Sequence, residues 1–202
     1  MTDFAVATED ALSEAVAETL LRQSGGHVVH TRLRRNGCGY LKSKIGAFNQ
    51  MAQTVMPVLL VTDLDQWRCP PELIADWLPG GSDPRLLFRV AVRETESWLL
   101  SDRWAFAEFL GLPTVTVPER PDDLMDPKAA LLKLVRKSKR RDLKQDILPA
   151  RGVSFPVGLG YNDRLIHFVR ERWDSQRAAQ VSASLARTVA RVARFNTGIA
   201  DQ

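Results

Sequence analysis

Val58-Leu59-Leu60-Val61-Thr62-Asp63-Leu64-Asp65 is the stretch of sequence that decides the fold class. A short apolar run that follows Pro57 and ends in polar residues is typical of a strand buried in a parallel sheet. Ligands of open α/β sheets bind beyond the carboxyl ends of such strands, which is where Asp63 and Asp65 stand. Two carboxylates one residue apart offer hard oxygen ligands to a cation such as Mg²⁺. Taken alone, the pair fits a solvated turn after the strand equally well.

The residues before this strand predict a regular alternation of strands and helices. Apolar residues recur at helical spacing in two segments, and short apolar or Val- and Thr-rich runs precede each of them. Thr8 is expected to cap the first helix, with Glu9 and Asp10 in its first turn, and Gly25-Gly26 is expected to end it. The expected elements are a strand at 4–7, this first helix, a strand at 27–33, a helix at 41–55 and the strand at 58–63. This order implies parallel strands joined by helices that cover the sheet.

The residues after Asp65 add one more strand and several helices. An apolar run at 86–92 is expected to form the fourth strand, and Trp98 beyond it is expected to lie in the core. Other expected segments are helices at 70–78 and 126–135, an extended Pro-rich stretch at 113–124, and helices at 164–173 and 182–195. We therefore predict an α/β domain at 1–135 with a four-stranded, mainly parallel sheet covered by helices. A basic segment and a helical C-terminal extension at 136–202 are expected to pack on it.

Length and composition narrow the class of protein. The 202 residues suit one domain with a small appendage, and 45% hydrophobic with 26% charged residues is an ordinary globular balance. No apolar run reaches the roughly 18 residues of a membrane span, and the first residues lack the basic region of a signal peptide. Two cysteines are too few for a disulfide framework. We expect a cytoplasmic protein with no membrane partner.

Acidic residues follow three of the four expected strands. Glu9 comes after the first strand, Asp63 and Asp65 after the third, and Glu94 and Glu96 after the fourth. The carboxyl ends of parallel strands meet at one edge of a sheet, so these carboxylates can converge there. Like charges so crowded are unfavourable unless a cation offsets them, which is a physical reason to expect a metal. The glutamates could instead complement the dipoles of the helices that follow them.

Other motifs either favour this chemistry or argue against alternatives. Lys128 follows Asp126-Pro127 at an expected helix start, where it is either a solvated lysine or a cation that stabilises charge near the metal. The three histidines form no metal-ligand pattern, and no Gly-x-Ser-x-Gly, Walker or kinase motif is present. The segment 158–162, Gly-Leu-Gly-Tyr-Asn, is more typical of a turn than of a phosphate loop. A zinc-based or histidine-based mechanism is therefore disfavoured.

A basic segment at 136–144 is the strongest local charge feature. It holds six Lys or Arg residues against one Asp. Such a cluster can bind phosphates through the release of counterions, although a solvated helix face is the simpler explanation when the segment is considered alone. The candidate nucleic-acid-binding residues are Arg136, Lys137, Lys139, Arg140, Arg141 and Lys144.

The glutamate after the first strand and the Asp-x-Asp pair after a later one resemble the Toprim fold. This fold occurs in topoisomerases, bacterial primases, recombination-mediator proteins and the overcoming-lysogenisation-defect nucleases. The segment 90–102, Val-Ala-Val-Arg-Glu-Thr-Glu-Ser-Trp-Leu-Leu-Ser-Asp, and Asp126-Pro127-Lys128 resemble an uncharacterised bacterial Toprim-like family found beside ATPases in defence loci. The resemblance covers about residues 4–135. Toprim proteins commonly have Glu-Gly after the first strand, whereas Asp10 follows Glu9 here.

The resemblance implies a two-metal site for Mg²⁺ or Mn²⁺ in which acids after the strands, a serine and a lysine act together. The metal ligands it implies are Glu9, Asp63, Asp65, one or both of Glu94 and Glu96, and Ser97. The catalytic residues it implies are Glu9, Asp63, Asp65, Glu96 and Lys128.

These observations favour a Mg²⁺-dependent phosphodiesterase that cleaves nucleic acid, with DNA as the expected partner, in a defence or repair system. A second hypothesis is a non-catalytic Toprim-like module that binds metal, nucleotide or a partner protein and acts with a separate ATPase. A primase-type nucleotidyl transferase is a weaker third hypothesis, because no template-binding zinc domain is present. Topoisomerase-type strand transfer is disfavoured, because Tyr40 and Tyr161 are the only tyrosines and neither lies in a recognisable second domain.

Overall fold

A four-stranded sheet forms the centre of the protein in the computed structural model, which describes residues 1–33, 37–150, 152 and 154–195. The strands are β1 (Asp3–Thr8), β2 (Val28–Arg32), β3 (Val58–Asp63) and β4 (Leu86–Ala91). They lie in the order β2-β1-β3-β4, and each neighbouring pair is parallel. The predicted α/β class and the parallel sheet are therefore confirmed, and the pairing among these strands is parallel throughout.

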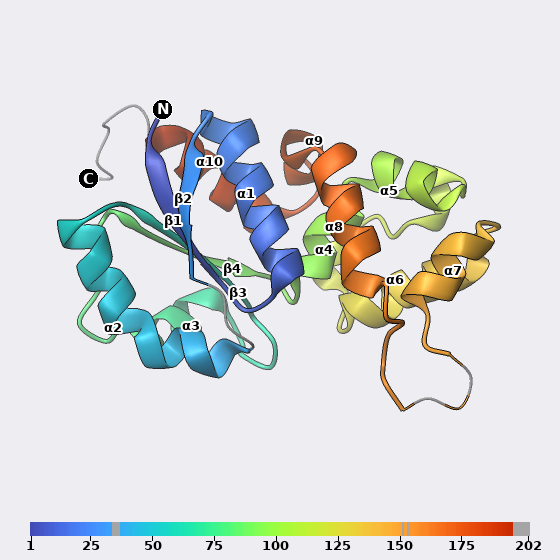
Figure 1. The fold of residues 1–202 in the computed structure, drawn as a ribbon, viewed down its shortest axis with the longest axis horizontal. Helices are drawn as coiled ribbons and strands as arrows, with labels where there is room; N and C mark the ends of the chain where they lie inside the picture. Colours follow the sequence, from blue (N-terminus) through green and yellow to red (C-terminus); the bar gives the residue numbers. More distant parts are fainter. Residues whose placement is uncertain (34–36, 151, 153, 196–202) are drawn as a thin grey trace.

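Helices cover both faces of the sheet because alternate strand residues point to opposite sides. Phe4 and Val6 belong to one hydrophobic cluster, whereas Ala5 and Ala7 belong to the other. Figure 1 shows α1 on one side of the sheet and α2 and α3 on the other. Their bounds are α1 (Ala11–Gly25), α2 (Cys38–Thr54) and α3 (Pro70–Trp77). Right-handed crossovers explain this division, since the step from β1 to β2 runs opposite to the steps from β2 to β3 and β4.

The first helix begins differently from the prediction. Thr8 is the last residue of β1, and Asp10 caps α1 by accepting a 2.8 Å hydrogen bond from Ser13 N. Aspartate is a favoured N-cap residue, and its carboxylate also complements the positive end of the helix. Asp10 has extended backbone angles (φ −144°), so no glycine is needed after Glu9. Glu9 therefore lies between strand and helix, outside the first helical turn.

Among the described residues after β4, all regular secondary structure is helical. The α-helices are α4 (Thr95–Ser101), α5 (Arg103–Leu110), α6 (Pro127–Lys137), α7 (Arg141–Ile147), α8 (Tyr161–Glu171), α9 (Ser175–Ala179) and α10 (Ala183–Phe195). The predicted extended stretch at 113–124 instead contains two short 3₁₀ helices, Thr114–Thr116 and Pro121–Asp123. The sequence pattern did not predict α7 and α9, and it placed the start of α8 three residues late.

The C-terminal helices share one hydrophobic core with the sheet. Helices α8 and α10 pack against α1, and α10 also packs against β4. Phe168 of α8 and Val192 of α10 belong to the same cluster of buried residues as Phe4 of β1. The ring of Phe195 lies 4.9 Å from that of Phe4, so the described end of the chain touches its first strand. In the part of the chain that the structure describes, no helix is long and apolar enough to cross a membrane.

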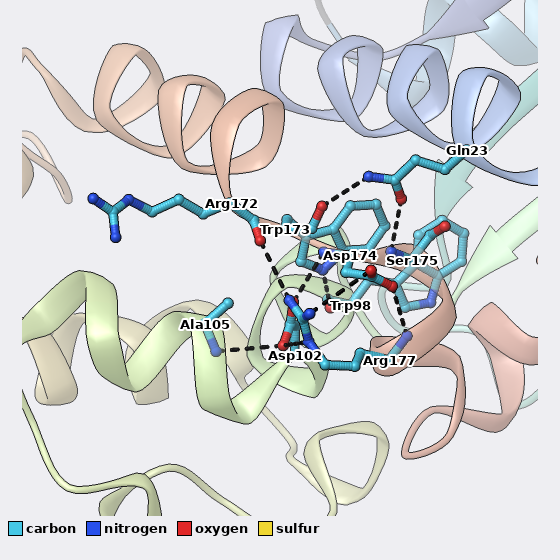
Figure 2. Close-up of polar contacts among 9 residues, drawn as sticks. All are labelled: Gln23, Trp98, Asp102, Ala105, Arg172, Trp173, Asp174, Ser175 and Arg177. Carbon is cyan, nitrogen blue, oxygen red and sulfur yellow. Dashed lines mark hydrogen bonds and ion pairs between the residues drawn. The ribbon is translucent and has the colours of Figure 1, made fainter.

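Two residues of the 90–102 segment, Trp98 and Asp102, anchor these helices (Figure 2). Trp98 is fully buried, as predicted, and its carbonyl accepts a hydrogen bond of 3.0 Å from Trp173 Nε1. Asp102 is 1% exposed and accepts hydrogen bonds from Arg177 Nε and Nη2 at 2.9 and 2.6 Å. It also accepts from the backbone of Asp174 at 2.9 Å. These side chains join α4 and α5 to the start of α9.

Candidate metal centre

The strand order reverses between β1 and β3. From β1 the chain crosses to β2 on one side, and from β2 it crosses back to β3 on the other side of β1. Doubly wound sheets bind their ligands at the carboxyl ends of the strands where this reversal occurs. Glu9 directly follows β1 and Asp63 is the last residue of β3, so both stand at this position.

Glu9 reaches across to the neighbouring strand. Its Oε1 accepts a 3.2 Å hydrogen bond from Asp63 N and another hydrogen bond from the Thr62 hydroxyl. Burial raises the pKa of Glu9, and the charges of Asp65 and Asp10 add to this, while the two hydrogen bonds act in the opposite direction. The expected convergence of Glu9 and Asp63 at one edge is therefore present.

Asp63 is held by the start of α4. Its Oδ1 accepts hydrogen bonds of 2.8 Å from both Thr95 N and Thr95 Oγ1. The Thr95 hydroxyl also lies 3.4 Å from the Ser13 hydroxyl of α1. Burial raises the pKa of Asp63 well above its ordinary value, and the charges of Glu96 and Glu9 raise it further. Asp63 is thus the acid at the centre of the group, and the carboxylates of Glu96, Glu9 and Asp10 are close enough to repel it.

Asp65 occupies a different environment from Asp63. It is exposed, and its φ of 49° places it in the left-handed region that aspartate tolerates better than most residues. Arg93 fixes this turn, because its Nη1 donates to the carbonyls of Asp65 and Trp67 at 3.1 and 3.2 Å. The charge of Asp65 reaches Glu9, whose pKa it helps to raise. Asp65 therefore lies at the solvent side of the acidic group.

Glu96 is buried and already has two partners. Tyr161 donates a 2.6 Å hydrogen bond from its hydroxyl to Glu96 Oε1, and Lys128 Nζ lies 3.9 Å from the same oxygen. The ammonium of Lys128 also lies 5.1 Å from the centre of the Tyr161 ring. Burial raises the pKa of Tyr161, and the negative charge of Glu96 and the hydrogen bond to it raise it further. Tyr161 thus stays protonated and serves as a donor.

Glu94 and Ser97 are turned toward other groups. Glu94 Oε2 accepts a 2.9 Å hydrogen bond from Lys128 N at the start of α6, and burial raises its pKa. Its carboxylate therefore accepts from the amino terminus of α6 and complements the dipole of that helix, whereas the sequence analysis considered the helix that directly follows Glu94. Ser97 is fully buried, and its hydroxyl donates to the Val92 carbonyl at 2.7 Å. The structure does not bring Ser97 into hydrogen-bonding contact with the carboxylates.

The donor set suits a hard cation that needs few protein ligands. Among the described residues, no three His, Cys, Asp or Glu side chains are already arranged to hold a metal ion. Hydrogen bonds from described residues engage only Oε1 of Glu9 and Oδ1 of Asp63, so the second oxygen of each remains for a ligand. Mg²⁺ is usually held by one or two carboxylates and keeps several waters. Glu9 and Asp63 therefore fit Mg²⁺, whereas a closed cage made only of protein ligands is not formed.

Lysines and arginines of the basic segment 136–144 lie on α6, α7 and the turn between them. All are exposed except Lys144, which is half-buried. Arg140 is committed to local contacts, since its guanidinium donates to the Phe109 carbonyl at 3.1 Å and to Asp142 at 3.0 Å. Asp142 also lies 3.8 Å from Arg164. The exposed members are therefore available to a polyanion, while Arg140 has a structural part.

The sequence analysis missed the residues that hold the acids in place. Thr62, Thr95 and Tyr161 donate to Glu9, Asp63 and Glu96, and none of them was singled out as a site residue. Thr62 and Thr95 each stand next to a predicted acid, which is the only local signal they carry. Comparisons with protein-family models, with curated proteins and with solved structures give no match.

Proposed function

We propose that the chain is a Toprim-like, Mg²⁺-dependent phosphodiesterase that cleaves nucleic acid, with DNA as the preferred substrate. One observation carries the proposal: Glu9 and Asp63 meet where the strand order reverses, and each keeps one oxygen beyond its hydrogen bonds. Paired carboxylates at this position suit a cation that binds phosphate oxygens. A role in defence or repair belongs to the same proposal, through the resemblance of the 90–102 segment.

Glu9 and Asp63 would hold the cation, and Asp65 would reach it from the solvent side. A bound Mg²⁺ supplies Lewis acidity and neutralises charge on the phosphate. The protein's own contribution is orientation, because Thr62, Thr95 and Asp63 N keep the two carboxylates from rotating. Carboxylates fixed before the substrate arrives need no reorganisation during the reaction.

Lys128 and Glu96 would act beside the cation. The side chain of Lys128 is 40% exposed, so its Nζ can reach a phosphate while staying near Glu96. A lysine there stabilises the negative charge that develops on the phosphate during attack. The hydroxyl of Tyr161 donates to Glu96 and would hold its carboxylate in place, close enough for its charge to raise the pKa of Asp63.

A second candidate is a non-catalytic module that binds a metal, a nucleotide or a partner such as an ATPase. It is favoured by the contacts of Glu96, whose charge Tyr161 and Lys128 already offset without a metal. In this case the acids would bind one ion or one phosphate-bearing ligand, and no bond would be broken. Both candidates use the same site, and they differ only in whether the protein cleaves its bound ligand.

Metal-dependent cleavage separates the two candidates. Purified protein is incubated with labelled plasmid and with a single-stranded oligonucleotide, in Mg²⁺, in Mn²⁺ and in EDTA. Cleavage that needs the metal and disappears in Asp63→Asn supports the phosphodiesterase. The matched control is Glu119→Gln, which removes an 85% exposed carboxylate elsewhere and should leave cleavage unchanged. Absence of cleavage with both metals, or cleavage that survives Asp63→Asn, rejects the phosphodiesterase.

A further inference from the structure

Arg93 belongs to the 90–102 segment, but the sequence analysis did not include it among the site residues. It comes two residues after the end of β4, and its side chain is half-buried. At this end of β4, Ala91 pairs with Asp63 of β3. Arg93 therefore lies beside the turn that follows β3 and carries Asp65.

Arg93 contacts the backbone on both sides of the Asp65 side chain. Its carbonyl accepts hydrogen bonds from Leu64 N at 2.9 Å and from Asp65 N at 3.1 Å. Its guanidinium donates from Nη1 to the carbonyl of Asp65 at 3.1 Å and to that of Trp67 at 3.2 Å. The peptide groups before and after Asp65 are thus both bonded to one residue. A change in φ or ψ that took Asp65 out of its present conformation would break at least one of these hydrogen bonds.

The conformation of Asp65 needs such support. Its φ of 49° lies in the left-handed region, which is unfavourable for residues with a side chain, although aspartate tolerates it better than most. The preceding residue, Leu64, is 2% exposed and is fixed by its packing in the core. Asp65 itself is exposed, so burial cannot fix it in the same way. Its conformation therefore depends on the hydrogen bonds to Arg93.

This conformation places the carboxylate of Asp65 near Glu9. Burial raises the pKa of Glu9, and the charge of Asp65 adds to this. Burial also raises the pKa of the Cys38 thiol at the start of α2, and the charges of Glu9 and Asp65 raise it further. The two carboxylates are thus within electrostatic reach of each other and of the same thiol. A change of φ to negative values would redirect the Cα–Cβ bond of Asp65 and move its carboxylate away from this position.

We propose that Arg93 is a positioning residue, which holds Asp65 in the conformation that lets its carboxylate bind the same cation as Glu9 and Asp63. Residues that orient metal ligands from behind are a recurrent part of metal sites, and their loss typically weakens metal binding about 10- to 100-fold. Arg93 binds the backbone of Asp65, so the contact uses neither oxygen of the carboxylate. The inference rests on the cation site of the proposed function, but it does not require cleavage.

Direct contact with the substrate is the alternative role for Arg93. A guanidinium has five N–H donors, so those that the two carbonyls leave could bind a phosphate oxygen. The two roles predict effects of opposite sign on metal affinity. Removal of a nearby positive charge should by itself strengthen the binding of a cation. Loss of the positioning role should weaken it, because Asp65 would no longer reach the cation.

Binding of the metal alone is measured with Mn²⁺ by electron paramagnetic resonance, and with Mg²⁺ by competition, in the absence of nucleic acid. Arg93→Ala should weaken Mn²⁺ binding about tenfold or more. Arg93→Lys keeps the charge and one donor group, so its loss of affinity should be smaller. Asp65→Asn removes the ligand charge and keeps a residue that tolerates the left-handed conformation. If Arg93 acts through Asp65, adding Arg93→Ala to Asp65→Asn should cause no further loss of affinity.

The matched control is Arg103→Ala, which removes another half-buried arginine that donates to a backbone carbonyl. In α5, Arg103 Nε and Nη2 lie 3.2 and 3.1 Å from the carbonyl oxygen of Val117. This change should leave Mn²⁺ binding as in wild type. Thermal melts in EDTA separate a loss of affinity from a loss of the fold. If Arg93→Ala does not fold, Arg93→Lys alone and combined with Asp65→Asn gives the same comparison.

Unchanged or tighter Mn²⁺ binding by Arg93→Ala overturns the inference, and so does an equal loss of affinity with and without the Asp65 carboxylate. Weaker DNA binding in EDTA, with Mn²⁺ affinity unchanged, would assign Arg93 to the substrate phosphate instead. If the metal binds with the expected coupling but cleavage is never seen, the role of Arg93 stands and the phosphodiesterase fails. If cleavage occurs and metal affinity does not depend on Arg93, the opposite holds. Wild-type protein that binds neither metal rejects both.

Discussion

Tyr161 donates a hydrogen bond of 2.6 Å to Glu96, which lies 65 positions earlier in the sequence. The turn before Tyr161 makes this contact possible, because Gly158 N and Gly160 N donate to the carbonyls of Ile147 and Asp146 at 2.8 and 2.9 Å. A Cβ on Gly160 would lie 2.7 Å from Asp146 Cβ, so the close approach needs glycine there. The predicted turn is thus confirmed, and its effect is to bring a tyrosine from the C-terminal third to the acids.

Replacing Tyr161 by Phe should destabilise the protein by about 1.5 to 3 kcal/mol, the range for a buried hydrogen bond to a charged group. The ring is kept, so packing changes little and removal of the hydroxyl accounts for the effect. Denaturant unfolding of Tyr161→Phe, Glu96→Gln and the double variant measures the coupling. A coupling near zero would mean that the two side chains do not interact in solution.

Stability in the absence of metal should fall as pH rises through the titration of Asp63. Its pKa in the folded protein is raised well above the ordinary value of 3.8, so the folded state keeps a proton that the unfolded state has released. The contribution is fully present below about pH 3.8 and disappears above the raised pKa. Asp63→Asn cannot titrate, so its stability relative to wild type should increase across this window. Urea unfolding at a series of pH values gives the difference.

Asp142 provides a control for that pH series, because its contribution to stability should change with pH in the opposite direction. The hydrogen bond from Arg140 lowers its pKa, so its contribution is present at neutral pH and is lost as pH falls through the lowered value. Asp142→Asn should therefore lose stability relative to wild type as pH rises. Parallel curves for the two variants would contradict the assignment for Asp63.

Mg²⁺ or Mn²⁺ should raise the melting temperature. A ligand that binds only the folded state stabilises it by about 2.7 kcal/mol at a hundredfold excess over Kd. Relief of repulsion among Asp63, Glu9 and Glu96 adds to this. Asp63→Asn should abolish the response, and Glu119→Gln should keep it. A melt that does not respond to millimolar metal would contradict a site formed by Glu9 and Asp63.

Arg177→Ala should destabilise the protein by about 3 kcal/mol without changing metal binding, because removing one partner of a buried ion pair leaves an uncompensated charge. The uncompensated charge here is the carboxylate of Asp102. The value lies at the low end of the usual range because Arg177 is 42% exposed. Asp102→Asn combined with Arg177→Ala removes the uncompensated charge and should recover part of the stability. Equal stability of the single and double variants would show that Asp102 is not the cause.

The basic segment 136–144 should add affinity for nucleic acid without affecting chemistry. Arg136→Ala with Lys139→Ala removes two exposed charges and should lower the salt slope of duplex binding by about 2. Arg140 is a poor choice for this test, because its contact with Phe109 makes it structural. Cleavage at saturating DNA should be unchanged. An unchanged salt slope would leave this segment as a solvated surface.

Local pattern was sufficient to predict the first half of the fold. Buried strands and amphipathic helices differ in period, and each of the elements from β1 to β4 repeats its pattern long enough to be recognised. Helices α7 and α9 were missed because seven and five residues span at most two turns. Such short helices are stabilised by tertiary contacts, as Leu143 and Ala178 show by being fully buried.

The candidate site, too, could be predicted only in part. Glu9 and Asp63 could be placed together because parallel strands bring their carboxyl ends to one edge. The partners of Glu94 and Glu96 could not be predicted, because Lys128 and Tyr161 come from helices whose positions depend on packing.

The contact between Phe4 and Phe195 also has a consequence for how the protein is made. Translation at about 5 to 20 residues per second separates the synthesis of these two residues by roughly 10 to 40 s. Throughout that interval β1 lacks the aromatic ring that closes over it, and α8 and α10, which pack against α1, are synthesised only near its end. The ribosome-bound chain therefore exposes apolar residues of β1 and α1 that are later buried. A chaperone that binds apolar segments is expected to bind them during this time.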